Sequence, residues 1–520
     1  MLKSKILLAL TVCVVVLSVW LSIAGDVDRI VALNTVLLGA AVNLMAIPLG
    51  IAVAMSCMGK SWFSNLTITI CLSLIFVPLF VYVSAWDAAF GKLGWITGIS
   101  TGANQTVGPW LMAIWIHGLA AIPQVSIVLW LGMTMSGRVH EERASLDANQ
   151  NSIFWHITLP KIMPLIGLAI VWNFVVCARE IAVTDIYRIG TLAEQIYLGY
   201  SLSDFDAMSG AMTTVIIIAT VAAIVFFTLL PTTANDSLTM DLMKNSKSRT
   251  PPFFASFITT LVLLVLVAAP AINLIARASR SVDFVKGDPI VSYSLANMFS
   301  VVARVPSTFV EEFCWSTTIA ATSTIILTLV SVLLVWRSTQ SRRWKIMLLG
   351  SMAVCCSLPG PLIGSGLLEA RSWIDLQSFQ WLFDRTVFAP VVANTLFCFP
   401  ISVVLVWFIF QNIARDADES MATEGASPIT RLFQLVVLAN GKMLLGSMII
   451  VFAVCFGELS ATQLAVPPGI DTIPRRMLGL LHSGVNDHTA GLTIVSVCTV
   501  WLLILAGFWL FNWNQKSYNE

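Results

Sequence analysis

The chain has 520 residues, of which 57% are hydrophobic and only 11% are charged, with a formal net charge of +1. Soluble domains carry roughly 25% charged residues, so this composition excludes a soluble globular protein and predicts an integral membrane protein. The balanced charge gives no indication of a nucleic-acid partner. The ten cysteines lie almost entirely within apolar runs and lack metal-ligand spacing, so we expect buried thiols and no metal site.

Apolar runs of about 20 residues predict about 12 transmembrane helices. In chain order they are 6–24, 34–57, 66–86, 109–135, 161–179, 210–230, 253–276, 314–336, 345–366, 387–412, 437–457 and 489–512. The first 25 residues resemble a secretory signal peptide, but the length of their apolar run favours a retained first helix. A polar segment at 231–252 ends in two prolines, and we interpret it as a cytoplasmic linker between halves 1–230 and 253–520.

The distribution of basic residues orients the predicted helices. The cluster Arg342-Arg343-Lys345 lies in a loop that faces the cytoplasm when the N-terminus is placed inside. This orientation puts both chain termini and both long polar loops, 141–160 and 419–438, in the cytoplasm. The sequence therefore predicts a multi-pass membrane protein with cytoplasmic ends.

The two halves repeat each other at a nearly constant offset. Pro359 follows Pro78 by 281 positions, and Glu458 follows Glu180 by 278. Six spans per half is an even number, so both copies have the same orientation in the membrane. The predicted fold is an all-α membrane protein made of two parallel tandem repeats of six helices.

The polar loops at 141–160 and 419–438 belong to this repeat, because Glu419 follows Glu141 by 278 positions. Acidic residues near the start of a short helix are favoured by the helix dipole. In the second loop, 425–428 reads Gly-Ala-Ser-Pro, which ends one short helix and begins another. Each loop also has an apolar face that can bury against the membrane domain or a partner.

The spacing of Glu, small residues, Gly, nine residues and Ile-x-Leu-Pro resembles the EAA loop of bacterial ABC importer permeases. In that family the loop forms a coupling helix that docks in a groove of the ATPase subunit. The residues expected to couple are Glu141, Glu142, Ala144, Asp147, Ile157, Leu159, Pro160, Glu419, Ala422, Gly425, Ala426 and Leu435. Arg143 and Asp147 depart from the small residue and the glycine of the pattern, and Val437-Leu438 replaces Leu-Pro, so the bend of each helix is open.

The resemblance covers almost the whole chain and implies the fused permease subunit of a type I importer, which moves a small solute from the periplasm to the cytoplasm. The implied partners are two ATP-binding subunits, an extracytoplasmic solute-binding protein and membrane lipid, in a bacterial inner membrane. Residues 457–477 resemble ferric-iron permeases, so ferric iron is the predicted cargo. Thiamine, polyamines and oxyanions are the alternatives from related permeases.

Glu180 and Glu458 each follow a polar loop by about 20 residues, near the outer end of a predicted span. Acids at membrane depth are costly and usually face a cavity or a partner, so both are candidates for the outer mouth of the pathway. The alternative is a structural ion pair with Arg179 or with Arg475-Arg476. No catalytic constellation and no cofactor site are predicted in this chain.

Residues 58–61 read Met-Gly-Lys-Ser but lack the first glycine and the strand of a phosphate-binding loop, so ATP hydrolysis is expected on a separate chain. A secondary active transporter with 6+6 parallel repeats is the alternative function. Such proteins usually carry charged residues in mid-membrane. A membrane scaffold or sensor without transport would not explain why the polar loops repeat.

Overall fold

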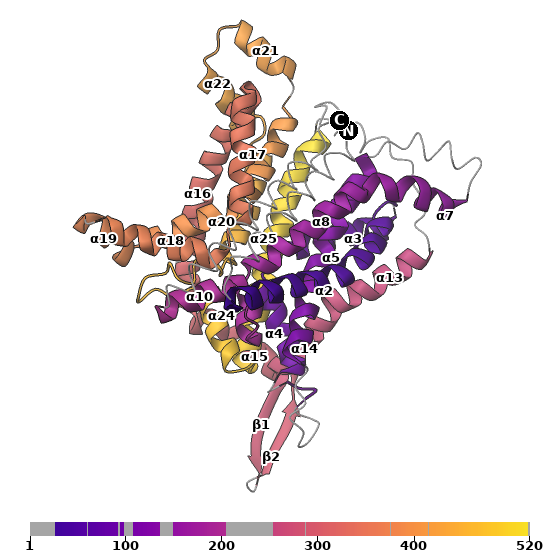
Figure 1. Ribbon diagram of the computed structural model, residues 1–520, viewed down its shortest axis with the longest axis vertical. Helices are drawn as coiled ribbons and strands as arrows, with labels where there is room; N and C mark the ends of the chain where they lie inside the picture. Colours follow the sequence, from indigo (N-terminus) through magenta and orange to yellow (C-terminus); the bar gives the residue numbers. More distant parts are fainter. Residues whose placement is uncertain are drawn as a thin grey trace. The chain divides into compact units, whose positions relative to one another are not determined.

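The computed structural model describes residues 26–59, 61–91, 94–97, 108–135, 149–203, 253–285, 288–374, 376–413 and 415–517. These residues form two compact units. Figure 1 shows their helices and strands. Unit 1 takes its described residues from Met1–Ile75, Tyr82–Gln195 and Ser203–Arg277. Unit 2 takes its described residues from Phe76–Val81, Ile196–Leu202 and Ala278–Glu520.

The elements of the first part of the chain are all helices. They are α2 (Asp26–Ser56), α3 (Trp62–Leu74), α4 (Leu79–Phe90), α5 (Pro109–Met135), α7 (Gln150–Ile153), the π-helix η1 (Phe154–Thr158), α8 (Leu159–Arg179), α9 (Ala182–Tyr187), α10 (Leu192–Leu202), α13 (Phe253–Leu263), the π-helix η2 (Leu264–Ala268) and α14 (Ala269–Ser279). Helix α2 is the centre of unit 1, because it packs against α5, α8 and α13.

Close packing around α2 depends on small residues and on paired polar groups. A Cβ added at Gly39 would lie 2.3 Å from the ring of Phe174, so only glycine lets α8 approach this closely. Asn173 donates a hydrogen bond to the side-chain oxygen of Asn43 at 2.9 Å in the buried interface. Polar groups buried in an apolar interior are stable only when they are paired in this way.

The second part of the chain adds a β-hairpin to a helical bundle. Its elements are β1 (Arg280–Val285), β2 (Asp288–Tyr293), α15 (Leu295–Thr308), α16 (Val310–Gln340), α17 (Arg342–Ser357), α18 (Gly360–Trp373), α19 (Gln377–Arg385), α20 (Phe388–Gln411), α21 (Arg415–Thr423), α22 (Pro428–Leu432), the π-helix η3 (Phe433–Leu438), α23 (Gly441–Phe456), α24 (Ile473–His482) and α25 (Asp487–Ser517). The antiparallel hairpin pairs Arg280 with Tyr293 and Val285 with Asp288. The sequence analysis did not predict it.

In unit 2, α16 packs against α17, α20 and α23, and α23 packs against α25. Figure 1 shows α16, α17 and α20 side by side. The α23–α25 contact is made by backbone, since a Cβ added at Gly446 would lie 2.6 Å from the carbonyl oxygen of Gly507. Ser331 and Ser402 join α16 to α20 by a buried hydrogen bond of 2.8 Å. Small residues and hydroxyl pairs are typical of helix packing in membranes.

Seven described helices are long and apolar enough to cross a membrane, and three bent helix pairs raise this number to ten if each pair is one span. The chain is therefore a mainly α-helical, multi-pass membrane protein. The predicted spans 6–24 and 210–230 and the linker 231–252 lie outside the described residues. The total of twelve spans and the division into two halves stay predictions; α13 and α14, which follow the linker, pack within unit 1 up to Arg277.

Three predicted spans differ from the structure, because each is broken. The predicted helices 66–86 and 345–366 are the pairs α3–α4 and α17–α18, and each pair is bent by 101°. The breaks fall at Pro78 and Pro359, where proline removes a backbone donor and Pro359 has extended angles of φ −61° and ψ 145°. The predicted helix 437–457 is interrupted before Gly441, and η3 and α23 differ in direction there.

Candidate functional site

The first polar loop is described only in its second part. Glu141, Glu142, Ala144 and Asp147 lie outside the described residues. Asn149 caps α7 by accepting a hydrogen bond from the backbone N–H of Ser152 at 2.9 Å, and α7 passes through η1 into α8. Along this helix Ile157 and Leu159 are half-buried, and Pro160 is exposed.

The second polar loop is a helix–turn–helix made by α21 and α22. Gly425 connects the helices with a φ of +83°, a left-handed angle that favours glycine. Ser427 begins α22 by accepting a hydrogen bond from the backbone N–H of Thr430 at 3.2 Å, and Pro428 occupies the first helical position. The predicted end of one helix and start of the next at 425–428 is thus observed.

An ion pair holds the two short helices together. Nη1 of Arg431 in α22 lies 2.9 Å from Oδ1 of Asp418 in α21, thirteen residues earlier. The predicted coupling residues of this loop are exposed or half-buried. Glu419, Ala422 and Gly425 are exposed, while Ala426 and Leu435 are half-buried.

The described part of each polar loop exposes an aromatic side chain. Trp155 is 63% exposed and Phe433 is 53% exposed, and they are 278 positions apart. Ile429, which is 74% exposed, extends the apolar surface of the second loop. Exposed apolar surface of this kind is typical of a site that contacts a protein partner or the membrane.

Glu180 closes a tight turn at the end of α8. Its carboxylate accepts hydrogen bonds from the backbone N–H groups of Ala182 at 2.6 Å and Val183 at 3.2 Å, at the N-terminus of α9. The hydroxyl of Thr184 donates back to the carbonyl oxygens of residues 180 and 181. Nε2 of His117 in α5 lies 4.0 Å from the same carboxylate. The carboxylate is thus fixed by the backbone that follows it.

Glu458 makes a similar turn after α23, in which the two donors lie one residue further along the chain than in the Glu180 turn. Its carboxylate accepts from the N–H groups of Ala461 at 2.6 Å and Thr462 at 3.1 Å, and the hydroxyl of Thr462 donates back to carbonyl oxygens 458 and 459. The paired distances in the two turns agree within 0.1 Å. The Glu458 side chain is nearly buried, with 7% of the residue exposed.

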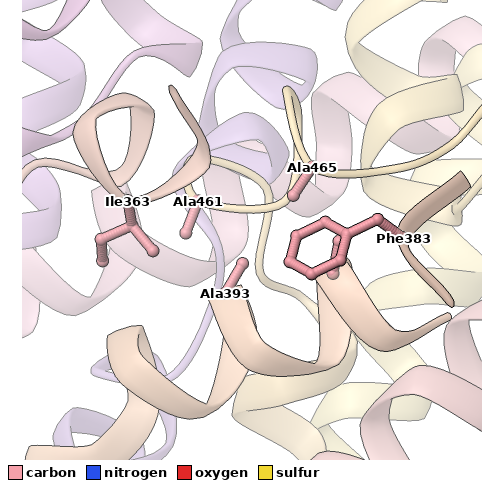
Figure 2. Packing of buried hydrophobic residues seen from close by; sticks show 6 residues of the cluster. Ile363, Phe383, Ala393, Ala461 and Ala465 are labelled. Carbon is pink, nitrogen blue, oxygen red and sulfur yellow. The ribbon is translucent and has the colours of Figure 1, made fainter. Parts of the chain in front are cut away.

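The Glu458 turn is packed against α18, α19 and α20. Figure 2 shows Ala461 and Ala465 of the turn facing Ile363, Phe383 and Ala393. A Cβ added at Gly360, the first residue of α18, would lie 2.4 Å from the backbone of Ser460. The turn can reach this position only because α18 begins with glycine.

The alternative ion-pair partners of Glu458 have other neighbours. Arg475 lies 4.0 Å from Asp471, and Arg476 lies 3.7 Å from Glu312. The structure therefore gives Glu180 and Glu458 a role in holding a turn. Their role in lining a pathway stays a prediction.

A second matched feature, not predicted from the sequence, links a long helix to a short helix in each unit. The hydroxyl of Thr35 in α2 accepts from the N–H of Leu192 at 3.1 Å, and the hydroxyl of Ser316 in α16 accepts from the N–H of Ile473 at 2.9 Å. Both pairs are separated by 157 residues. The offset of 281 between Thr35 and Ser316 was the available signal, but hydroxyls inside apolar runs are too common to stand out.

Glu194 is a buried acid in unit 1, four residues into the segment that begins at Thr191. It is 6% exposed and lies in the first turn of α10. Burial raises the pKa of its carboxyl group to about 7, and the charge of Asp185 adds to this effect, whereas a backbone hydrogen bond at Thr191 opposes it. The residue 281 positions later is Arg475, so unit 2 has no equivalent acid.

No family model matches the sequence. The chain is similar to a Salmonella typhimurium protein named as a 2-aminoethylphosphonate transport system permease, PhnV, with 27% identity over 156 residues. This match covers 29% of the chain and 54% of PhnV, so the chain spans about half the length of that relative. It is also 24% identical over 186 residues to the molybdenum transport system permease protein ModB of Haemophilus influenzae, covering 34% of the chain and 81% of ModB. The chain is thus a helical membrane protein similar to permease proteins of two transport systems.

Proposed function

We propose that the chain is the membrane-spanning permease subunit of an ATP-driven ABC importer. The observation that carries the proposal is the pair of polar loops, each with an exposed aromatic residue, Trp155 and Phe433, at one offset in the chain. The similarity to transport system permeases supports it. ATP would be hydrolysed by two separate subunits, and each would hold one loop.

The second loop is built to transmit movement. The Asp418–Arg431 ion pair and the Ser427 cap fix α21 and α22 to each other, so a force on one short helix moves both. From there η3 connects to α23, which ends at the Glu458 turn. A cycle of ATP binding and hydrolysis shifts this assembly only if the ATP-binding subunits contact the loops differently in their two states.

The proposed setting is a bacterial inner membrane, with both polar loops and both termini in the cytoplasm. The basic cluster 342–345 at the start of α17 supports this orientation. A soluble binding protein would deliver the solute on the opposite side. The two units would then form the pathway without a second permease chain.

For the cargo, we propose a small oxyanion in preference to ferric iron. The names of the two relatives refer to a phosphonate and to molybdenum, and neither refers to iron. Uptake of radiolabelled molybdate, 2-aminoethylphosphonate and ferric iron by the same cells, with and without the chain, distinguishes the two cargo classes. Thiamine and a polyamine serve as further probes.

The coupling role is tested by changing the repeated acids. We expect the Glu141→Ala, Glu419→Ala double variant to lose uptake while it still inserts in the membrane, because both loops lose contacts with the ATP-binding subunits. Glu424→Ala is a matched control, since Glu424 is exposed in the same loop but lies outside the pattern. Normal uptake by the double variant would contradict the proposal.

The energy source is tested in proteoliposomes. We expect the purified chain alone to move no solute in response to a proton or sodium gradient, and to move it when the ATP-binding subunits, the binding protein and ATP are present. Gradient-driven uptake by the chain alone would instead identify a secondary active transporter.

A further inference from the structure

Exposed tryptophans gather on the segment that joins α18 to α19. Trp373 at the end of α18 is 81% exposed, Trp381 in α19 is 61% exposed, and Leu376 between the helices is 61% exposed. Side chains of this size are rarely left in water without a partner. In Figure 1, α18 and α19 extend away from the side-by-side helices α16, α17 and α20.

The level of this segment in the membrane follows from α17. This helix begins at the basic residues Arg342 and Arg343, which favour the cytoplasmic side, and its 16 residues span roughly 24 Å at 1.5 Å per residue. Its far end therefore lies near the outer surface of a bilayer whose hydrocarbon core is about 30 Å thick. At that end the chain bends by 101° into α18. A helix at a right angle to a span runs along the membrane surface.

Contacts of α19 place it at the same level. Phe383 packs edge-on against Phe388, the first residue of the span α20, with ring centroids 5.1 Å apart. Phe379 packs against Phe383 at 4.7 Å on the same face of α19. Trp381 is two residues from each of them, about 200° around the helix. One face of α19 thus packs against the first residue of the span α20, and Trp381 lies on the opposite face.

The charged groups of the segment exclude a position in the hydrocarbon core of the bilayer. Arg371 of α18 and Asp384 of α19 form a two-bonded ion pair, with 37% and 42% of their side chains exposed. A solvated ion pair is costly in the hydrocarbon core but stable among lipid headgroups. Tryptophan rings also concentrate at this boundary, because one part of the ring is apolar and its N–H is polar.

We propose that α18 and α19 form an arm that lies on the outer leaflet, with Trp373, Leu376 and Trp381 inserted at the level of the lipid headgroups. The arm anchors the bent helix α18 to the membrane surface. Gly360, the first residue of α18, packs directly against the backbone of the Glu458 turn. Lipid binding by the arm therefore fixes the helix against which that turn packs. This inference depends on the chain spanning the membrane and not on its cargo or energy source.

The test uses the full-length chain labelled with 5-fluorotryptophan in nanodiscs of phosphatidylethanolamine and phosphatidylglycerol. Trp373→Phe and Trp381→Phe identify the two fluorine resonances by their disappearance, and both positions are exposed enough to tolerate phenylalanine. A lipid with a nitroxide near its headgroup is then compared with a water-soluble gadolinium chelate. Trp86, which is 7% exposed, is the internal control that neither reagent should broaden.

We expect the nitroxide lipid to more than double the linewidths of Trp373 and Trp381, and the gadolinium chelate to have the smaller effect. Broadening by the chelate alone would place both rings in water and overturn the proposal. If neither reagent broadens them, protein covers the rings, and the proposal is also overturned. Where the chelate alone broadens the signals, loss of that broadening on addition of a soluble binding protein would identify the surface as a protein-docking site.

Discussion

The two units contain similar glutamate turns, but the connection between the polar loop and the helix that follows differs. In both turns the carboxylate accepts from two backbone N–H groups, those of Ala182 and Val183 at Glu180 and those of Ala461 and Thr462 at Glu458. In the first part of the chain η1 continues into α8 as one helix, Phe154–Arg179, whereas in unit 2 the segments Pro428–Leu438 and Gly441–Phe456 are bent by 74°. A carboxylate that accepts hydrogen bonds from the adjacent backbone fixes its turn by itself. The connection between a polar loop and the following helix, called the joint below, depends on all the residues of that connection.

The chemistry of the second joint explains its bend. Pro160 lies inside the continuous helix Phe154–Arg179, two residues after the end of the π-helical turn η1, and does not bend it enough to interrupt the span. Asn440 instead leaves the helix with φ −113° and ψ 22°, and its side-chain N–H donates to the carbonyl oxygen of Leu435 at 2.8 Å. The side chain thus replaces a lost helical hydrogen bond. A force on the two loops would consequently reach α8 and α23 through joints of different geometry.

The largest effect is expected from removing a turn carboxylate. Glu458→Leu leaves two buried N–H groups without an acceptor, and each costs about 1–3 kcal/mol, so we expect a loss of roughly 2–6 kcal/mol in the free energy of unfolding. Thermal unfolding in nanodiscs measures this effect. Glu180→Leu should have a similar effect, and an unchanged midpoint for either variant would contradict the role of the carboxylate.

Replacing the same two glutamates by glutamine distinguishes a role in holding the turns from a role in lining the pathway. Glu180→Gln and Glu458→Gln keep an acceptor for only one of the two backbone N–H groups, so we expect about half of the loss caused by leucine, roughly 1–3 kcal/mol. If the carboxylates also line the pathway, uptake falls in the glutamine variants by more than this loss of stability explains. Normal uptake in both would assign the two residues to the turns alone.

Another prediction concerns the pH dependence of the free energy of unfolding. Glu194 should cause such a dependence in unit 1, and unit 2 has no acid at the corresponding position. The pKa of Glu194 is raised from 4.5 to about 7, so its folded state binds a proton more tightly than its unfolded state. Its contribution to stability is fully present below about pH 4.5 and is lost as pH rises through 7, a change on the order of 3 kcal/mol. Thermal unfolding across this pH range measures the change.

Glu194→Gln should remove this part of the pH dependence, because glutamine does not titrate. Arg475→Gln, 281 positions later in unit 2, should leave the dependence in place, since this substitution keeps the carboxyl group of Glu194. A pH dependence that is the same in Glu194→Gln and the unaltered chain would show that another group is responsible.

The positions of the membrane helices were predictable because apolar length is a strong signal. The predicted helix 109–135 coincides with α5 at both ends. The breaks at Pro78 and Pro359 were not predictable from proline alone, because Pro123 and Pro400 lie inside unbroken helices. Tertiary packing determines which proline interrupts a span, as the contact of Gly360 with the Glu458 turn illustrates.

The candidate site was predictable in part for the same reason. The glutamates and the loop residues could be located from their constant offsets, since a repeat is visible in the sequence. The donors to each glutamate carboxylate are backbone N–H groups of the residues that follow it, which no offset reveals. The hydroxyls of Thr35 and Ser316 were missed because their partners are 157 residues away.

A smaller effect is expected at the joint of unit 2. Asn440→Ala removes the donor to the Leu435 carbonyl, and we expect the free energy of unfolding to fall by about 1 kcal/mol. If the bend transmits movement, uptake decreases more than this loss of stability explains. Pro160→Ala at the joint of the first loop is the comparison, and we expect little change because α8 is already continuous there. Equal effects of the two variants on uptake would contradict the mechanical difference between the joints.

The smallest effect is expected at the paired hydroxyls. Ser316→Ala leaves the buried N–H of Ile473 without its acceptor, which should lower the free energy of unfolding by about 1 kcal/mol. Thr35→Val should cost a similar amount at Leu192, whereas Thr35→Ser keeps the hydroxyl and should cost less. Hydrogen exchange of these two amides reads out each contact directly. Equal loss of protection at the two amides would mean that α10 and α24 are held to α2 and α16 in the same way, and that the difference between the units is confined to the segments that connect the polar loops to α8 and α23. Loss at only one amide would extend the difference to the contacts of α10 and α24.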